Sequence, residues 1–407
     1  MSRGEAKNVS PRRDGAAPST SSGAGALFAL AAAATCFITG ESLPVGLLPQ
    51  VAASFHSSLS ATGLLVTVYA AVVFLASAPL THLTRDVPRR ILLAGALAAF
   101  GFGTLAAAAA PTYAWMLAAR VVTALPQALF WSVAPVAAAS LFGPEARGRA
   151  VAGVFSGSAV GIVVGVPAET WLGQQAGWRV AWIVLAGVGL LTGAAIAKLI
   201  PTSRPADSHS ATGTNPDRRR YRILVVATIL AVAGFYTTFT YISAYLTRIS
   251  GIGRHDVALV LLASGTASTA GLAAGGVLYA RRPVFALVSP AGLMAVALLG
   301  LWALGTGGAV ATGCQALDGF GLGTMIVAVQ TAVLTYAPGR TDIATAWFSA
   351  AFNVGIAAGP LIGGLALTNL GLRSTALAGA VLATAALLAA LNLRSSRIGP
   401  PASPEPV

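Results

Sequence analysis

Charged side chains are scarce in this sequence: only 9% of its 407 residues are Asp, Glu, Lys or Arg, whereas 56% are hydrophobic. A soluble domain carries about 25% charged residues, because its surface must be solvated. The shortage therefore excludes an ordinary soluble globular domain. Together with a mean hydropathy of +0.77, it indicates that most side chains face lipid or other helices.

Residues typical of catalytic and metal sites are also few. The two cysteines, Cys36 and Cys314, lie in apolar runs, where we expect small apolar side chains rather than a disulfide. The four histidines are dispersed without the spacing of metal ligands. There is no P-loop, and no Ser, His and acid share a plausible layer. We therefore expect no metal site, no enzymatic activity and no ATP-driven transport.

Long apolar runs are abundant instead. A membrane-spanning helix needs about 20 mostly apolar residues, and lipid admits only helices or closed barrels. The runs lack the alternation of barrel strands, so the sequence predicts an all-α polytopic membrane protein. The twelve predicted spans are residues 26–48, 60–81, 91–110, 112–141, 149–172, 180–200, 222–246, 256–279, 284–304, 307–336, 342–370 and 373–393.

The net charge of +13 is explained by position along the chain. With the amino terminus inside, 20 of the 25 Lys and Arg residues fall in the tails and inner loops. The outer loops hold only Arg179, Arg248, Arg254 and Arg373, and one residue, Arg120, lies within a span. This bias predicts that both termini are cytoplasmic, and nucleic-acid binding has no separate support.

Composition divides the chain into a tail, two helical halves and a linker. Residues 1–25, rich in Ser, Arg, Gly and Pro, are predicted to be a disordered cytoplasmic tail. Residues 201–221 form a polar cytoplasmic linker between two six-helix bundles, 26–200 and 222–393. A short cytoplasmic tail, 394–407, follows the last span.

The two halves also repeat each other. A constant shift of 194 positions superposes a set of proline, glycine and arginine residues: Pro144 on Pro338, Gly161 on Gly355, Gly165 on Gly359, Gly177 on Gly371 and Arg179 on Arg373. A chance match in a glycine-rich sequence is the alternative. Two related six-helix bundles, with a pseudo-two-fold axis between them, are typical of transporters that rock around a site near the bilayer midplane.

Four ionisable residues lie inside predicted spans. Burying a charge in the bilayer costs free energy, so such residues are the first candidates for functional groups. From the rise along a helix, Glu41, Arg120 and Asp318 lie about 12, 10 and 14 Å from the outer ends of their spans. We therefore expect them to share one polar layer and to couple protons. The fourth, Glu169, lies about 6 Å from its outer end and is expected to be interfacial.

Glu41 is the predicted proton carrier. Burial disfavours a charged carboxyl and a nearby guanidinium favours it, so a carboxyl between the two effects can bind a proton from outside and release it inside. Arg120 or a polar substrate would compete for the deprotonated form, which couples proton entry to substrate exit. A static Glu41–Arg120 pair that only orients helices is the alternative. Asp318 is either a second titrating site or a hydrogen-bonding group between helices.

Aromatic and amide side chains around this layer are suited to a medium-sized ligand, because aromatic rings offer flat contact and amides orient polar groups. The predicted substrate-binding residues are Tyr69, Gln127, Phe130, Trp131, Tyr236 and Asn353, with Tyr241 and Gln330 as further candidates. Trp131 and Phe130 are favoured, since they lie about three turns below Arg120.

Glycines recur at steps of four in the fifth and eleventh spans. Such steps form a flat groove that admits a neighbouring helix, and proline adds a kink. We interpret them as close, bendable contacts between the halves; ordinary tight packing is the alternative. The residues are Gly153, Gly157, Gly161, Gly165 and Pro167, and Gly355, Gly359, Pro360, Gly363 and Gly364.

Several short sequence motifs, taken in their order along the chain, resemble those of the major facilitator superfamily. The resemblance is to its twelve-helix drug:proton antiporters and, within them, to the bacterial sugar-efflux and chloramphenicol-resistance-like branch. The resemblance covers residues 27–393. Its carriers are Gly40-Glu41, Leu43-Pro44-Val45-Gly46-Leu47-Leu48-Pro49, Gly63-Leu64-Leu65-Val66-Thr67 with Tyr69, Pro88-Arg89-Arg90, Ala119-Arg120, Leu129-Phe130-Trp131-Ser132, Gly165-Val166-Pro167, Gly177-Trp178-Arg179, and Phe352-Asn353-Val354-Gly355 through Gly359-Pro360.

The resemblance implies efflux of a sugar, antibiotic or related metabolite across the bacterial inner membrane by alternating access. It implies a proton gradient as the energy source without a cofactor, and lipid, protons and a small molecule as partners of a monomer. It assigns proton coupling to Arg120 and the antiporter motif to Gly165–Pro167. Two departures are Arg85-Asp86 with Pro88 before Arg89-Arg90, which alters the usual charge relay, and Pro126-Gln127, which alters the polar lining. An importer or facilitator, and a sensor that moves no solute, are the competing hypotheses.

Overall fold

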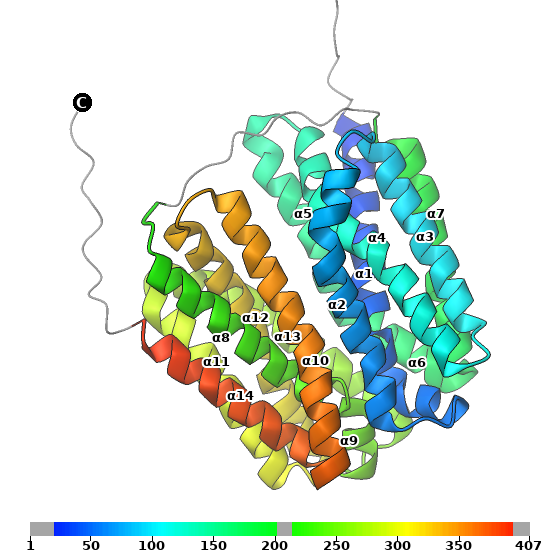
Figure 1. The fold of residues 1–407 in the computed structure, drawn as a ribbon, viewed down its shortest axis with the longest axis vertical. Helices are drawn as coiled ribbons and strands as arrows, with labels where there is room; N and C mark the ends of the chain where they lie inside the picture. Colours follow the sequence, from blue (N-terminus) through cyan, green and yellow to red (C-terminus); the bar gives the residue numbers. More distant parts are fainter. Residues whose placement is uncertain (1–19, 202–213, 394–407) are drawn as a thin grey trace, which may run out of the picture.

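The computed structural model describes residues 20–201 and 214–393 (Figure 1). Over these residues the chain is helical without a strand, and twelve helices are long and apolar enough to cross a membrane, as predicted. In chain order the helical elements are α1 (Thr20–Ser54), α2 (Leu59–Leu83), α3 (Arg89–Ala108), α4 (Tyr113–Ser140), η1 (Pro144–Ala146), α5 (Arg147–Val160), η2 (Gly161–Gly165), α6 (Val166–Ala176), α7 (Trp178–Leu199), α8 (Arg218–Phe239), α9 (Ile242–Arg248), η3 (Arg254–Asp256), α10 (Val257–Arg281), α11 (Pro283–Leu304), α12 (Gly308–Tyr336), α13 (Thr341–Leu370) and α14 (Ser374–Leu391).

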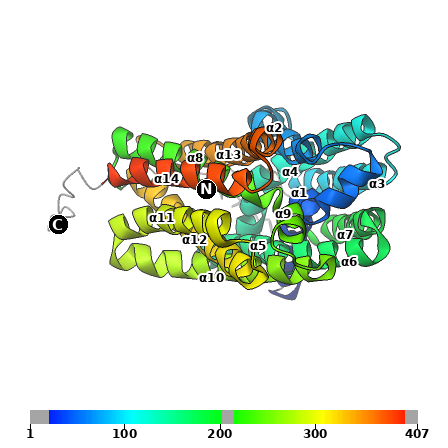
Figure 2. The same ribbon diagram turned by 90° about the horizontal axis from the view of Figure 1, so that it is seen from below.

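The helices form two bundles that lie side by side (Figure 2). In the first bundle α1 packs against α5, α6 and α7, and α3 packs against α4 and α7. In the second, α8 packs against α13 and α14, and α12 packs against α10 and α11. Most buried apolar side chains form one core in each bundle, and the core of the second bundle also takes in Val45, Val66, Ala70 and Val166 of the first. This is the predicted major-facilitator arrangement of two six-helix bundles.

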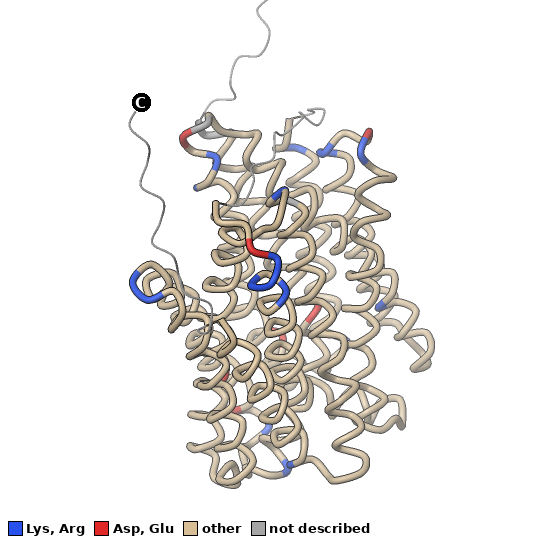
Figure 3. Tube along the Cα trace, turned by 60° about the vertical axis from the view of Figure 1, so that its left-hand side comes forward, with Lys and Arg blue, Asp and Glu red and all other residues tan. Residues whose placement is uncertain are grey.

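One end of the molecule is basic. We call the end at which α2 finishes and α3, α5, α8 and α11 begin the basic end, and the opposite end the far end. Arg89, Arg147 and Arg218 begin α3, α5 and α8, and Arg281 ends α10 just before α11. Lys and Arg gather towards this end (Figure 3). The structure therefore has the charge asymmetry from which the sequence predicted its orientation.

The repeat in the sequence is also a repeat of contacts. A Cβ added at Gly161 would lie 3.1 Å from Ile38 Cβ and 3.1 Å from the Thr35 carbonyl oxygen on α1. A Cβ added at Gly355 would lie 2.7 Å from the Cβ of Val232 and 3.0 Å from the carbonyl oxygen of Ile229 on α8. Both α8 residues stand 194 positions after their α1 counterparts. A chance match does not explain paired contacts, so the halves are structural repeats.

The described contacts between the bundles lie from the middle to the far end. The hydroxyls of Ser60 and Thr368 are 2.8 Å apart, and Thr67 donates to the carbonyl of Ala357 at 3.0 Å. At the far surface, the side chains of Gln175 and His255 are 3.0 Å apart. In Figure 1, α2 and α13 approach each other at the far end and diverge towards the basic end. The molecule is thus closed at its far end.

Two predicted spans differ from the structure in kind. The span predicted at 222–246 is two helices, α8 and α9, which part at Thr240–Tyr241. The span predicted at 149–172 contains a π-helix, η2, in which the Val166 N–H donates to the Gly161 carbonyl. Pro167 has no N–H for the regular helical pattern, which accounts for the irregular turn at this place.

The predicted tail and linker are shorter than expected. Helix α1 begins at Thr20, within the tail predicted for residues 1–25, and α8 begins at Arg218, within the linker predicted for residues 201–221. The remaining tail residues, most of the linker and residues 394–407 lie outside the described residues.

Candidate functional site

A connected polar cluster lies inside the first bundle. The Gln127 amide on α4 donates to Oε2 of Glu41 on α1 at 2.7 Å. The hydroxyl of Tyr69 on α2 donates to Oε1 of the same amide at 2.6 Å. All three side chains are buried, with only 6% of Glu41 exposed. The amide thus bridges the acid of one helix and the phenol of another.

Arg120 is hydrogen-bonded to the main chain of α1. Its guanidinium donates to the carbonyls of Gly40 at 2.7 Å and Glu41 at 2.9 Å, and it lies 4.0 Å from the centre of the Tyr69 ring. The Gly40 carbonyl needs such a donor, because Pro44 lacks the N–H that would reach it in a regular helix. Arg120 therefore holds α1 at the carboxyl-bearing residue.

The ion pair considered from the sequence is not formed. Among the described residues, no ion pair joins the side chains of Glu41 and Arg120. Instead of an ion pair with the carboxylate, the guanidinium makes a hydrogen bond to the main-chain carbonyl of Glu41. One carboxyl oxygen, Oε1, has no hydrogen-bond partner among the described residues. It leaves an acceptor position for a proton or a polar ligand group.

Asp318 lies apart from this cluster, in the second bundle on α12. The side chain is 1% exposed, and neither of its oxygens has a hydrogen-bond partner among the described residues. The helix-to-helix hydrogen bond considered for it is therefore not formed. No bond in the described structure joins Asp318 to Glu41 or Arg120, so the three residues expected to share a layer do not form one cluster. Three residues before it on α12, Gln315 is hydrogen-bonded to Ser264 of α10.

Glu169, predicted to be interfacial, is buried among the helices. Only 8% of this α6 residue is exposed, and Oε2 has no hydrogen-bond partner among the described residues. Its neighbours one turn away, Gly165 and Gly173, pack against Thr39 and Leu47 of α1. The estimate of depth missed this burial because depth along a helix says nothing about the face that a side chain occupies.

The aromatic residues predicted to bind substrate divide into core and partly open positions. Phe130 is fully buried, with its ring 4.8 Å from that of Phe37, and has no surface for a ligand in this conformation. Trp131 is half-buried and stacks on Phe155 of α5, with ring centres 5.6 Å apart. Of the two, only Trp131 is open to a ligand here.

The binding residues predicted in the second half are also partly open. Tyr236 on α8 is half-buried and packs beside Phe235 and Phe239. Asn353 on α13 is half-buried, and its amide donates to the Ser349 carbonyl of its own helix at 3.0 Å. Neither side chain is locked to another helix by a hydrogen bond in the described structure.

Most groove glycines pack within their own half rather than between the halves, which corrects the expectation for them. Gly364 is the exception, since a Cβ added there would lie 3.2 Å from the Cβ of Ser60 on α2 of the first bundle. Gly157 and Gly165 meet Ala31 and Thr39 of α1, and Gly359 meets Tyr236 of α8, the counterpart of α1 in the second half. Glycines outside the two grooves also bring the bundles close: Gly265 of α10 meets the main chain of η2 at Ile162, and Gly63 of α2 meets the ring of Tyr241. The spacing of the glycines is visible in the sequence, but the helix that each of them contacts is not.

The altered loop between α2 and α3 makes local contacts. Arg85 and Asp86 form an exposed pair at 3.4 Å. Pro88 precedes α3, and the buried Arg89 donates to the Val136 carbonyl on α4 at 3.4 Å. Arg90 is half-buried. The loop is therefore tied to its own bundle in this conformation.

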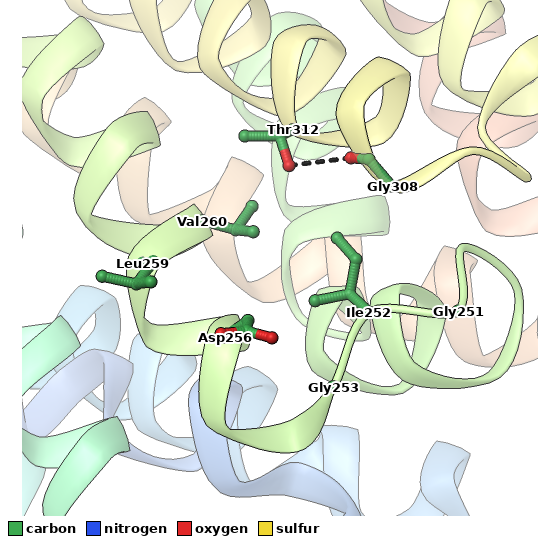
Figure 4. Close-up of a pocket in the computed structure, with 8 residues that line it drawn as sticks. All are labelled: Gly251, Ile252, Gly253, Asp256, Leu259, Val260, Gly308 and Thr312. Carbon is green, nitrogen blue, oxygen red and sulfur yellow. Dashed lines mark hydrogen bonds between the residues drawn. The ribbon is translucent and has the colours of Figure 1, made fainter.

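A pocket of about 370 Å³ opens at the far end of the second bundle (Figure 4). Its wall includes the carboxylate of Asp256 and the hydroxyl of Thr312, which donates to the Gly308 carbonyl at 2.8 Å. No residue predicted to bind substrate lines it. It is separate from the Glu41 cluster.

Sequence reasoning missed one contributor, Trp182, and assigned another, Tyr241, to a different role. Trp182 on α7 is buried, with its ring centre 6.0 Å from the Arg120 guanidinium. The signal in the sequence is its four-residue spacing from Trp178, which places both rings on one face of the helix. Tyr241, considered for ligand binding, is a packing residue instead. Its hydroxyl donates to the Pro360 carbonyl at 2.7 Å, and its ring fills the space beside Gly63 of the other bundle.

Comparison with known proteins agrees with this fold. The model of the Major Facilitator Superfamily matches residues 30–338 and 224–406. The uncharacterized MFS-type transporter YtbD of Bacillus subtilis is 33% identical over 89% of this chain and 93% of its own length. A probable sugar efflux transporter of Mannheimia succiniciproducens is 30% identical over 88% of this chain and 91% of its own length.

Solved structures show the same architecture. A bacterial homologue of the human lysosomal transporter Spinster, in an inward-facing and unoccupied conformation, superposes with a TM-score of 0.75 at 15% identity, covering 94% of this chain and 100% of that one. The human organic anion transporter MFSD10 gives a TM-score of 0.67 at 15% identity, covering 90% and 99%. At this identity the likeness concerns the fold alone.

Proposed function

The chain belongs to the major facilitator superfamily, and from this premise we propose that it is a proton-coupled exporter of a small polar or amphipathic molecule. One observation carries the proposal. Among the described residues, the buried Glu41 carboxyl accepts a hydrogen bond from one neutral donor, the Gln127 amide, and its other oxygen has no partner. Arg120 donates to the main-chain carbonyl of the same residue. A carboxyl in such surroundings is suited to exchange a proton for a ligand.

We place the basic end in the cytoplasm of a bacterial plasma membrane, by the excess of Lys and Arg there. Closure at the far end then corresponds to an inward-facing state of a monomer. In this state Glu41 releases its proton to the cytoplasmic side and the substrate enters from that side. Reprotonation from outside, after the bundles rock, displaces the substrate.

Arg120 transmits this exchange to the main chain. When Glu41 loses its proton, the guanidinium gains a charged neighbour on the residue whose carbonyl it already holds. A shift of the guanidinium towards the carboxylate would release the Gly40 carbonyl, which has no other helical donor. Proton release therefore moves the Arg120 contact from the main chain of α1 towards the Glu41 carboxylate. No cofactor is needed, because the proton gradient supplies the energy.

We assign a second proton to Asp318. It is fully buried in the other bundle without a hydrogen-bonding partner among the described residues, and a charged carboxylate in that position would be costly. Because no bond joins it to Glu41, the two carboxyls act as separate proton sites.

We take sugars as the first substrate class, because a relative of this chain is called a probable sugar efflux transporter. Antibiotics of similar size are the second class, in which case the protein would confer drug resistance. Trp131, Tyr236 and Asn353 are the residues we assign to contact the substrate, since each is partly open.

The proposal is tested by transport into everted membrane vesicles, with labelled sugars and antibiotics as the panel. The wild type should accumulate at least one compound when the vesicle interior is acidified, and Glu41→Gln should not. Glu169→Gln is the matched control, because it neutralises another buried carboxyl of the same bundle outside the cluster. Gradient-driven accumulation by Glu41→Gln at the wild-type level would falsify the proton role. Loss of substrate from preloaded vesicles on acidification would identify an importer instead.

A further inference from the structure

An apolar groove runs along the outside of the second bundle. It has a volume of about 610 Å³ and lies between α10 and α11, with α12 as its floor. Figure 2 shows these three helices together at one side of the bundle. Its walls include Ala273 and Val277 of α10, Phe285 and Leu293 of α11, and Thr324 of α12.

The groove exists because both walls pack on the floor. Gly271 and Gly275 of α10 bring the helix against the main chain of α12 at Phe320 and Thr324. Gly321 of α12 admits α11 in the same way. With both helices drawn onto α12, the small side chain of Ala273 leaves open space between the walls.

The groove has the length of one lipid leaflet. From Ala273 to Arg281 the wall rises by about 12 Å, and one leaflet of the hydrocarbon core is about 15 Å thick. Arg281 closes the groove at the basic end. An acyl chain lying in it would thus have its headgroup beside this guanidinium.

The mouth of the groove is strongly cationic. Arg281 and Arg282 are adjacent and exposed, and neither has an ion pair among the described residues. The sequence has no acidic residue from position 257 to position 317. The equivalent loop of the first bundle differs, because Arg85 is paired with Asp86 and Arg89 is bonded to a carbonyl.

We propose that this groove binds an anionic phospholipid, with one acyl chain between α10 and α11 and its phosphodiester on Arg281 and Arg282. A guanidinium matches the geometry of a phosphate, and basic pockets between spans on the cytoplasmic side bind anionic headgroups. The start of α11 at Pro283 adds the positive end of a helix dipole. The proposal depends on the fold and on placement in a membrane, and not on the direction of transport.

Binding is measured by native mass spectrometry of the purified, delipidated full chain, with phosphatidylglycerol and phosphatidylcholine of identical acyl chains as probes. Phosphatidylglycerol should bind more tightly, and Arg281→Gln with Arg282→Gln should weaken it about thirtyfold. Arg147→Gln with Arg149→Gln is the matched control, because it removes two exposed arginines at the basic end of the other bundle. Its affinity should stay at the wild-type value.

A second variant tests the apolar part of the groove. Ala273→Phe should weaken the binding of both lipids, because its ring would occupy the space of the acyl chain. Equal affinities for the two lipids, or an equal loss in the control pair, would overturn the proposal. A dimer that dissociates in Ala273→Phe would also overturn it, since the occupant would then be a second copy of this chain.

Discussion

In the first bundle Gly161 rests against Thr35 and Ile38 of α1, and in the second Gly355 rests against Ile229 and Val232 of α8. The two contacts are related by the same shift of 194 positions. The turns before α7 and α14 repeat as well, with Gly177 and Gly371 at φ 91° and 86°. The bundles therefore share their packing down to individual contacts.

Their polar centres are not shared. At the same shift, Phe235 occupies the place of Glu41, and Cys314 the place of Arg120. Phe235 packs on Phe239, with ring centres 4.8 Å apart, where Glu41 receives a hydrogen bond from an amide. The second bundle has its own buried acid, Asp318, at a position where the first has Ala124.

The repeated residues support the packing of the helices, whereas the residues that differ carry the polar groups. Close packing of helices onto α1 and α8 is needed in both bundles, so the small residues are kept in register. The buried acids, by contrast, are specific groups that do not repeat: Glu41 and Asp318 stand at different positions in the two bundles. The comparison therefore predicts that changes at repeated contacts affect stability in both bundles, whereas changes in the polar centres affect transport unequally.

The largest effect is expected for Arg120→Lys. An ammonium keeps the charge but cannot hold the carbonyls of Gly40 and Glu41 together while it stacks on Tyr69. Loss of one charge-assisted hydrogen bond of about 1.5–3 kcal/mol corresponds to about a ten- to hundredfold fall in the initial rate of gradient-driven transport. The measurement is initial transport rate at equal amounts of folded protein.

Arg179→Lys is the matched control for this change. Arg179 also donates to a main-chain carbonyl, that of Ala110, and lies over the Trp178 ring, but it lies at the far end outside the polar cluster. Transport by Arg179→Lys should stay close to wild type. Equal losses in both variants would mean that Arg120 only supports the fold.

The sequence predicted the scaffold better than the polar centre, for physical reasons. The twelve spans are predicted by the length of the apolar runs. The repeat is visible because only glycine fits where two helices pack closely, so glycines recur at equivalent positions of the two halves. The acceptor of the Arg120 hydrogen bonds could not be predicted, because it is set by the missing N–H of Pro44 on another helix. The burial of Glu169 depends on which face meets α1, which a continuously apolar helix does not encode.

Asp318→Asn is expected to have a smaller effect that sharpens the same comparison. If each carboxyl carries one proton, the wild-type accumulation ratio rises about a hundredfold per unit of pH gradient and that of the variant about tenfold. The ratio is measured at steady state over several pH gradients, with the membrane potential clamped. An unchanged slope would remove Asp318 from the coupling and leave Glu41 as the single proton site assigned here.

The smallest effect tests the repeated contacts themselves. Gly355→Ala would bring a methyl group to 2.7 Å from Val232 Cβ, an atom of a stiff side chain, whereas the nearest atoms to a methyl group at Gly161 lie at 3.1 Å. Overpacking costs about 1–3 kcal/mol, and alanine recovers up to about 1 kcal/mol of helix propensity. Gly355→Ala should therefore lower the thermal midpoint in detergent, while Gly161→Ala changes it little. Gly313→Ala is the control, because open space surrounds its Cβ and only the helix propensity changes. Equal falls in the thermal midpoint for Gly161→Ala and Gly355→Ala would show that the two contacts are equally tight.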